Sequence, residues 1–231
     1  MKKIILFVSM LILSTGVVFA TDETLVEREQ AIQNRVNNVG IKILNANKIE
    51  KRVGFVYCKK DKKSFLKKMT EVDRRNIVLY ENDYKFVEND DELAALVSRG
   101  IMYALKSYGG FWNGYLSAFQ VKAAPKAYEI VADKRAVDFM VTAGYDPIGL
   151  ITYIHKSSPQ KKFDRFSNKN LTSKRLAIIY EYIFTKYPYF LANNKYLETE
   201  TYQNFLLTSI DNRKKLEDKI MRGSKEKVKY E

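Results

Sequence analysis

The sequence is poor in cysteine and in long apolar runs, and both shortages limit what the chain can be. Its 231 residues contain one cysteine, Cys58, so no disulfide can form within the chain and the fold must rest on its core. After residue 20 there is no second long apolar stretch, no internal repeat and no low-complexity block. These absences favour one globular domain over residues 21–231. The alternating stretch 53–58 predicts a half-buried structural thiol at Cys58.

Acidic residues are also scarce relative to basic ones. The chain has 27 acidic residues against 40 lysines and arginines, a formal net charge of +13. Such a charge favours anionic partners, and an exported chain meets membrane lipid, cell-wall polymer or acidic protein before nucleic acid. The densest basic clusters lie at residues 59–63 and 225–229, and their composition is typical of a solvated surface and of a frayed basic tail.

The first twenty residues predict where the protein works. Lys2 and Lys3 precede the apolar run 4–18, which ends in Val18-Phe19-Ala20 before charged residues. A charged start, an apolar run and a small residue at the cleavage point are typical of a secretory signal. We therefore expect residues 1–20 to be removed and the mature chain to be periplasmic or extracellular. An uncleaved signal would leave the protein anchored in the membrane.

The remaining pattern predicts an α+β fold that is mostly helical, with a small early sheet. Strands are expected at 53–58 and 76–80, where β-branched and aromatic residues concentrate. Apolar spacing predicts helices over 21–49, from the N-cap Asn89 to Gly109, and over 128–143, 148–155 and 172–187, with Gly40 a possible break in the first. The rest of the chain is expected to be helix ending in the frayed tail.

Two segments carry a resemblance to a known enzyme family. Residues 92–104 read ELAALVSRGIMYA, and residues 128–133 read YEIVAD ahead of AGYDP at 143–147. In this order they resemble the active-site helix, the E-x-x-x-D helix and the A-G-Y-D-P turn of the HtpX and CAAX prenyl protease type of zinc metallopeptidase. The stretch 171–175 is similar to one that follows a late His-Pro pair in that family. The resemblance covers about residues 53–188 and implies a zincin-like scaffold that uses zinc.

Matched position by position, the family's zinc chemistry is missing from this chain. A zincin holds its metal with two histidines of H-E-x-x-H and one further ligand, while the glutamate activates the bound water. Arg99 and Tyr103 fall where the histidines belong, and Gly100 falls where the glutamate belongs. Arginine is a permanent cation with no acceptor, glycine has no side chain, and tyrosine would ligate only as phenolate.

Other positions agree with a lost metal site. The sole histidine, His155, matches neither ligand position, and Lys169-Asn170 stands where the family has its late His-Pro pair. The family's third ligand is retained as Glu129, and Asp133 matches a carboxylate that orients a ligand histidine. No metal or other cofactor is expected.

The retained acids predict a substitute for the metal. A buried, unpaired carboxylate is costly, so we expect Arg99 to form an ion pair with Glu129 or Asp133 and the Tyr103 hydroxyl to act as an extra donor. In the alternative, both acids face solvent and pair with Lys134-Arg135.

These residues predict an exported pseudopeptidase that binds a peptide or protein of the cell envelope. Extended peptides bind such scaffolds by adding a strand to a sheet edge. The aromatic-rich stretch 111–119 could line the groove or belong to the core, and Arg175 could point into the groove or lie on the surface.

Two alternatives stay open. The first is an active metalloendopeptidase that holds its metal through Glu129, Asp133 and a carboxylate such as Glu92. The second is a basic binder of anionic envelope surfaces, for which the peptidase scaffold is incidental.

Overall fold

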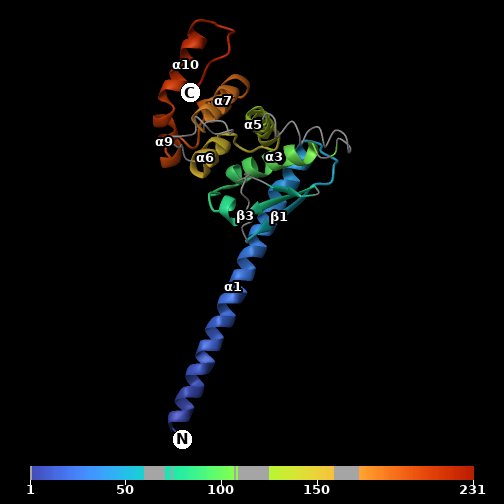
Figure 1. Cartoon of the computed structure of the whole chain (residues 1–231), viewed down its shortest axis with the longest axis vertical. Coiled ribbons are helices and arrows are strands. Elements are labelled where there is room, and N and C mark those ends of the chain that lie inside the picture. The colour runs from blue at the N-terminus through green and yellow to red at the C-terminus, as the bar shows by residue number, and fades with distance from the viewer. Residues whose placement is uncertain (1, 60–70, 74, 107, 109–124, 159–171) are drawn as a thin grey trace.

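The computed structural model describes residues 2–59, 71–73, 75–106, 108, 125–158 and 172–231, and it describes the side chains of residues 24–59, 75–105, 108, 128–158 and 172–231. Within these residues the fold is mostly helical with one small sheet (Figure 1), so the predicted α+β class is confirmed. Three sequence predictions lie outside the described residues: the lysines at 60–63, the aromatic stretch 111–119 and the Lys169-Asn170 pair. The side chains of the expected signal, residues 1–20, also lie outside them.

The elements follow one another in a simple order. The strands are β1 Gly54–Cys58, β2 Glu71–Asp73 and β3 Asn76–Tyr80. The helices are α1 Lys2–Ala46, α2 Glu81–Tyr84, α3 Asp90–Lys106, α5 Pro125–Thr142, α6 Ile148–Ser157, α7 Thr172–Lys186, α8 Pro188–Ala192, α9 Glu200–Thr208 and α10 Ile210–Met221.

The sheet has the strand order β1-β3-β2, with β1 parallel and β2 antiparallel to β3. The strands predicted at 53–58 and 76–80 are present as β1 and β3, and Cys58 is half-buried. The three-residue β2 is absent from the prediction because so short a strand carries no clear alternation. Phe55, Ile77 and Leu79 turn inward and form the sheet's share of the core.

Helix α1 differs from the predicted helix 21–49 in where it starts and in having no break at Gly40. It begins at Lys2 instead of residue 21, and it runs unbroken through Gly40. Gly40 serves close packing, because a β-carbon there would stand 2.5 Å from the Phe55 ring. Val36, Val39 and Ile43 fix this end of α1 to the core, whereas its N-terminal end leaves the body (Figure 1). Among the residues searched, which are those the structure describes, no helix is both long and apolar enough to cross a membrane.

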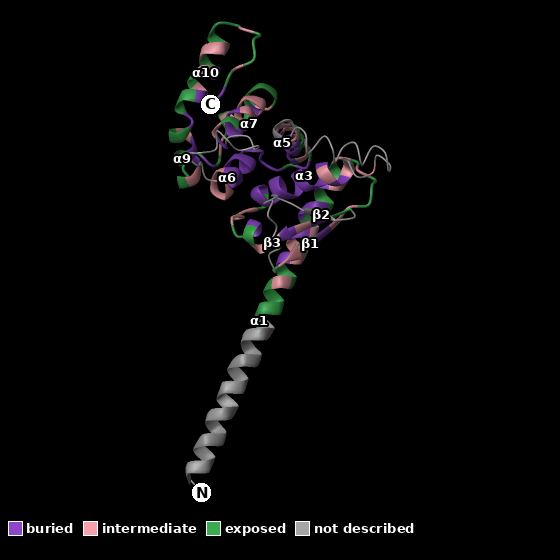
Figure 2. Cartoon of the chain, in the orientation of Figure 1, coloured by how far each residue is buried: buried purple, intermediate pink, exposed green. Residues whose placement is uncertain are grey.

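Helix α3 is the central element of the core. It contacts α1, β3, α5 and α6, and Figure 2 shows it almost entirely buried. The predicted cap is present, since the Glu92 amide donates to Asn89 Oδ1 at 3.0 Å. Most side chains of α3 from Leu93 to Ile101 are fully buried, so polar groups on this helix must find partners inside the protein.

The expectation of a frayed C-terminal tail is wrong. Gly223 takes a left-handed φ of 59° after α10, and the chain turns back toward α7. Tyr230 is only 6% exposed and donates its hydroxyl to Glu181 Oε2 at 2.9 Å. The basic segment 225–229 is therefore held at both ends, because the residues on either side of it make specific contacts that the sequence pattern does not reveal.

Candidate functional site

Three helices bring the predicted site residues close together, with Arg99, Asp133 and Arg175 buried. Arg99 and Tyr103 lie one turn apart on α3, and Glu129 and Asp133 lie one turn apart on α5. Residues four apart share a helix face, so each pair presents its two side chains to the same neighbour. Helix α7 adds Arg175 from its first turn. We call these five residues the Arg99 cluster.

Asp133 is the centre of the cluster. Its Oδ1 lies 3.2 Å from Arg99 Nε, and Arg175 donates to it twice, from Nε to Oδ2 at 2.6 Å and from Nη2 to Oδ1 at 2.8 Å. The exposed fractions of Arg99, Asp133 and Arg175 are 2%, 1% and 5%. The structure thus pairs Arg99 with Asp133, and it places Arg175 inside the protein instead of on the surface.

The charges of the cluster stabilise one another. Burial works against the Arg99 cation, but the attraction of Asp133, Tyr103 and Glu129 raises the pKa of Arg99 above its usual value. Burial raises the pKa of the Asp133 carboxyl to about 7; Arg99 opposes this rise and Glu129 adds to it. The two-pronged contact from Arg175 further favours the ionised carboxylate. Two cations and two acids therefore compensate one another in this cluster.

The sequence predicts a donor role for the Tyr103 hydroxyl, and in the structure this hydroxyl also accepts from Arg99. The guanidinium of Arg99 has only donors, so in their hydrogen bond the Tyr103 hydroxyl accepts. Burial raises the pKa of Tyr103, with Arg99 opposing. The phenol is therefore protonated near neutral pH.

Gly100 faces away from the cluster and toward the sheet. A β-carbon at Gly100 would stand 2.5 Å from Ile77 Cγ2 and 3.1 Å from Ile77 Cδ1. This distance is shorter than any ordinary contact, so α3 and β3 depend on a glycine here. The position that the resemblance assigns to the catalytic glutamate is thus occupied by helix–sheet packing.

The start of α3 holds a second polar network that is separate from the Arg99 cluster. Glu92 is 1% exposed, and its carboxylate accepts from Thr152 Oγ1 at 2.7 Å and from Lys156 Nζ at 2.8 Å. Asp91 accepts from the amide of Asp146 at 2.9 Å and so anchors the A-G-Y-D-P turn to α3. Both acids have structural partners.

A metal site built from carboxylates is not supported by this arrangement. Glu92, which the alternative metal site would use with Glu129 and Asp133, has its carboxylate bonded to Thr152 and Lys156 in the network at the start of α3. No group of three histidine, cysteine, aspartate or glutamate side chains gathers in the part of the chain that the structure describes. His155 is half-buried, and its ring lies edge-on to Phe205 with centroids 6.5 Å apart.

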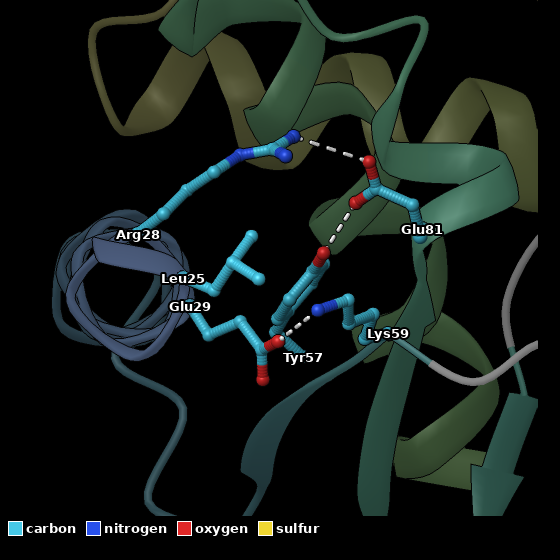
Figure 3. Close-up of a pocket in the computed structure, with 6 residues that line it drawn as sticks. All are labelled: Leu25, Arg28, Glu29, Tyr57, Lys59 and Glu81. Atoms are coloured by element: carbon cyan, nitrogen blue, oxygen red, sulfur yellow. Dashed lines mark hydrogen bonds and ion pairs between the residues drawn. The ribbon is translucent and has the colours of Figure 1, made fainter. Parts of the chain in front are cut away.

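The pocket in Figure 3 lies where α1 meets the sheet, outside the cluster. It measures about 280 Å³, including space open to solvent, and Leu25 and Tyr57 line it among charged residues. Those charges are paired: Arg28 with Glu81 at 3.2 Å, and Lys59 with Glu29 at 2.9 Å. The Tyr57 hydroxyl also donates to Glu81. The side chains that line the pocket thus connect α1 to the end of β1 and the start of α2.

A sequence-based search could not have found the part that Arg175 plays. One arginine in a helix start gives no sign of its partner 42 residues earlier, whereas the spacing of Arg99 and Tyr103 placed both on one face. Comparison of the chain with protein-family models, with curated proteins and with solved structures finds no match in any of the three.

Proposed function

We propose that this chain is an exported, non-catalytic protein on a zincin-like scaffold, and that it binds peptide or protein segments in the cell envelope. The observation that carries the proposal is the Arg99–Asp133–Arg175 arrangement. The resemblance puts a metal ion between the residues at positions 99, 103 and 129, and here the same region holds a buried guanidinium. A second cation would have to enter against that charge.

The general base of the family's mechanism is missing as well. The position of the general base is Gly100, whose surroundings leave no room for a larger side chain. A hydrolase of this type needs both a metal-bound water and a base to take its proton. Because this chain lacks both the residues for a metal-bound water and the base, we infer that it keeps the scaffold without catalytic activity.

Peptide binding at β1 by strand addition is disfavoured. The Gln33 side chain of α1 donates to the carbonyl of Phe55 at 2.9 Å and accepts from the amide of Tyr57 at 2.8 Å. These are outward-facing backbone groups that an added strand would use. A bound segment must therefore use a different surface, unless α1 moves away.

The proposal is tested on the exported chain. Bound metal is measured by elemental analysis, and casein cleavage is followed with and without added zinc and with a chelator. We expect zinc far below one ion per chain and no chelator-sensitive cleavage, with an active zincin as the positive control. Stoichiometric zinc together with chelator-sensitive cleavage would rule the proposal out. Sequencing from the N-terminus checks export, with Thr21 expected as the first residue.

A further inference from the structure

Residues 230 and 231 occupy a site formed by α7 and α10. Ser173 and Glu181 of α7 and Asn212, Lys215 and Lys219 of α10 surround the dipeptide, and we call these five residues the α7–α10 slot. The segment that leads into it, 222–229, is mostly exposed. The dipeptide is thus joined to α10 by a solvated linker and held by its own contacts.

The slot binds the backbone of its occupant. The Asn212 side-chain amide donates to the backbone oxygen of Glu231 at 2.9 Å and accepts from the amide of Glu231 at 3.1 Å. Ser173 Oγ donates to the same backbone oxygen at 2.7 Å. A carboxamide that exchanges both hydrogen bonds with one residue imitates a neighbouring β-strand, and it does so whatever side chain that residue carries. Asn212 is only 4% exposed, so its orientation is fixed.

The side chains in the slot select the occupant. The buried ring of Tyr230 ends at Glu181, and Lys219 lies 2.7 Å from the same carboxylate. Burial raises the pKa of Tyr230 and Glu181 adds to the rise, so the phenol remains a donor. The carboxylate of Glu231 lies 2.7 Å from Lys215 in an exposed pair, which contributes less. The chemistry fits a tyrosine followed by an acidic residue.

We propose that the α7–α10 slot is a peptide-binding site, occupied here by the chain's own Tyr230–Glu231, that accepts in trans an extended peptide with a tyrosine followed by an acidic residue. The tethered dipeptide competes at an effective concentration on the order of millimolar. A peptide supplied in trans therefore binds fully only when Tyr230–Glu231 has left the slot. This inference rests on the peptide binding proposed above and names the site for it. Zinc content is measured in a separate experiment, so either proposal can fail without the other.

The test uses the full chain and the peptide Lys-Val-Lys-Tyr-Glu, labelled at its N-terminus and carrying a free C-terminal carboxylate to match the occupant. Tyr230→Ala removes the buried ring and leaves the chain's own segment held only through Glu231, which weakens it as a competitor. Fluorescence polarisation should therefore show binding to that variant and binding at least about tenfold weaker to the unaltered chain. The peptide with alanine in place of tyrosine should not bind. Adding Asn212→Ala to Tyr230→Ala should abolish binding, whereas Asn204→Ala, at an exposed position of α9 outside the slot, should leave it unchanged.

Absence of binding to a folded Tyr230→Ala chain, or equal binding to both chains, would overturn the proposal. If that variant does not fold, hydrogen exchange of the unaltered chain decides. Millimolar peptide should then displace the chain's own segment and accelerate exchange over residues 224–231. Exchange that stays unchanged at that concentration overturns the proposal as well.

Discussion

Gly100 of α3 lies so close to Ile77 of β3 that a β-carbon on the glycine would stand 2.5 Å from the isoleucine's Cγ2. This contact sets the distance between the central helix and the sheet. The resemblance assigns position 100 to catalysis, whereas in this structure the position serves the packing of α3 against the sheet. Returning a glutamate to position 100 would therefore damage the fold before it could restore any chemistry.

Gly100→Ala should destabilise the protein by about 1–2 kcal/mol, because the overpacking penalty exceeds the gain in helix propensity. Urea unfolding followed by circular dichroism measures the change. In an Ile77→Ala background the added methyl group has room, so the penalty should disappear or reverse. A penalty of equal size in both backgrounds would show that the two residues are not coupled.

Asp133→Asn should cost about 3–5 kcal/mol, because Arg99 and Arg175 lose the carboxylate that compensates them in the interior. Asp138→Asn on the same helix is the matched control. Its carboxylate accepts from Tyr182 and Lys186 but is more exposed, so about 1–2 kcal/mol is expected. Both values come from chemical unfolding.

Replacing the three buried charged residues Arg99, Asp133 and Arg175, with the less buried Glu129 kept, separates the pairing from simple loss of bulk. Arg99→Met, Asp133→Leu and Arg175→Met together should leave the protein about as stable as before, since well-packed apolar residues often substitute for a buried ion network without loss. A triple variant that is less stable than Asp133→Asn would contradict the view that uncompensated charge causes the loss.

Local features of this fold could be predicted from the sequence, whereas contacts between distant segments could not. The N-cap Asn89 and the shared face of Arg99 and Tyr103 were predictable, because capping and helical spacing are local. The partners of Arg175 and Tyr230 were not, because both contacts join segments more than 40 residues apart. The residues of the cluster could thus be named in advance, while the central position of Asp133 and the docked tail could not.

Gln33→Ala should lower stability by about 1–3 kcal/mol, since it leaves the Phe55 carbonyl and the Tyr57 amide of β1 without their side-chain partner. The variant should also aggregate faster, because an uncovered strand edge pairs with other chains. Gln30→Ala is the control on the same helix, where the exposed side chain bonds only to Asn34. Light scattering and urea unfolding that do not distinguish the two variants would contradict the role given to Gln33.

Asp146 predicts a pH dependence of stability. Burial raises the pKa of this carboxyl from 3.8 to about 6, Ile148 opposes the rise and Asp91 adds to it. The folded chain thus holds the proton more tightly than the unfolded chain, so its contribution to stability is full below pH 4 and falls as pH rises to about 7. The unaltered protein should lose on the order of 1 kcal/mol over this window relative to Asp146→Asn. A constant difference between the two across these pH values would contradict the prediction.

The measurement that tests the central claim most directly is zinc titration by calorimetry of the unaltered chain and of the double variant Arg99→His, Tyr103→His, with Gly100 kept. If Arg99 occupies the place of a metal ion, the unaltered chain binds no zinc. The double variant, which combines two histidines with Glu129, should bind one ion. Tight zinc binding by the unaltered chain that is lost on Glu129→Gln would contradict the account, and so would a folded double variant that binds none.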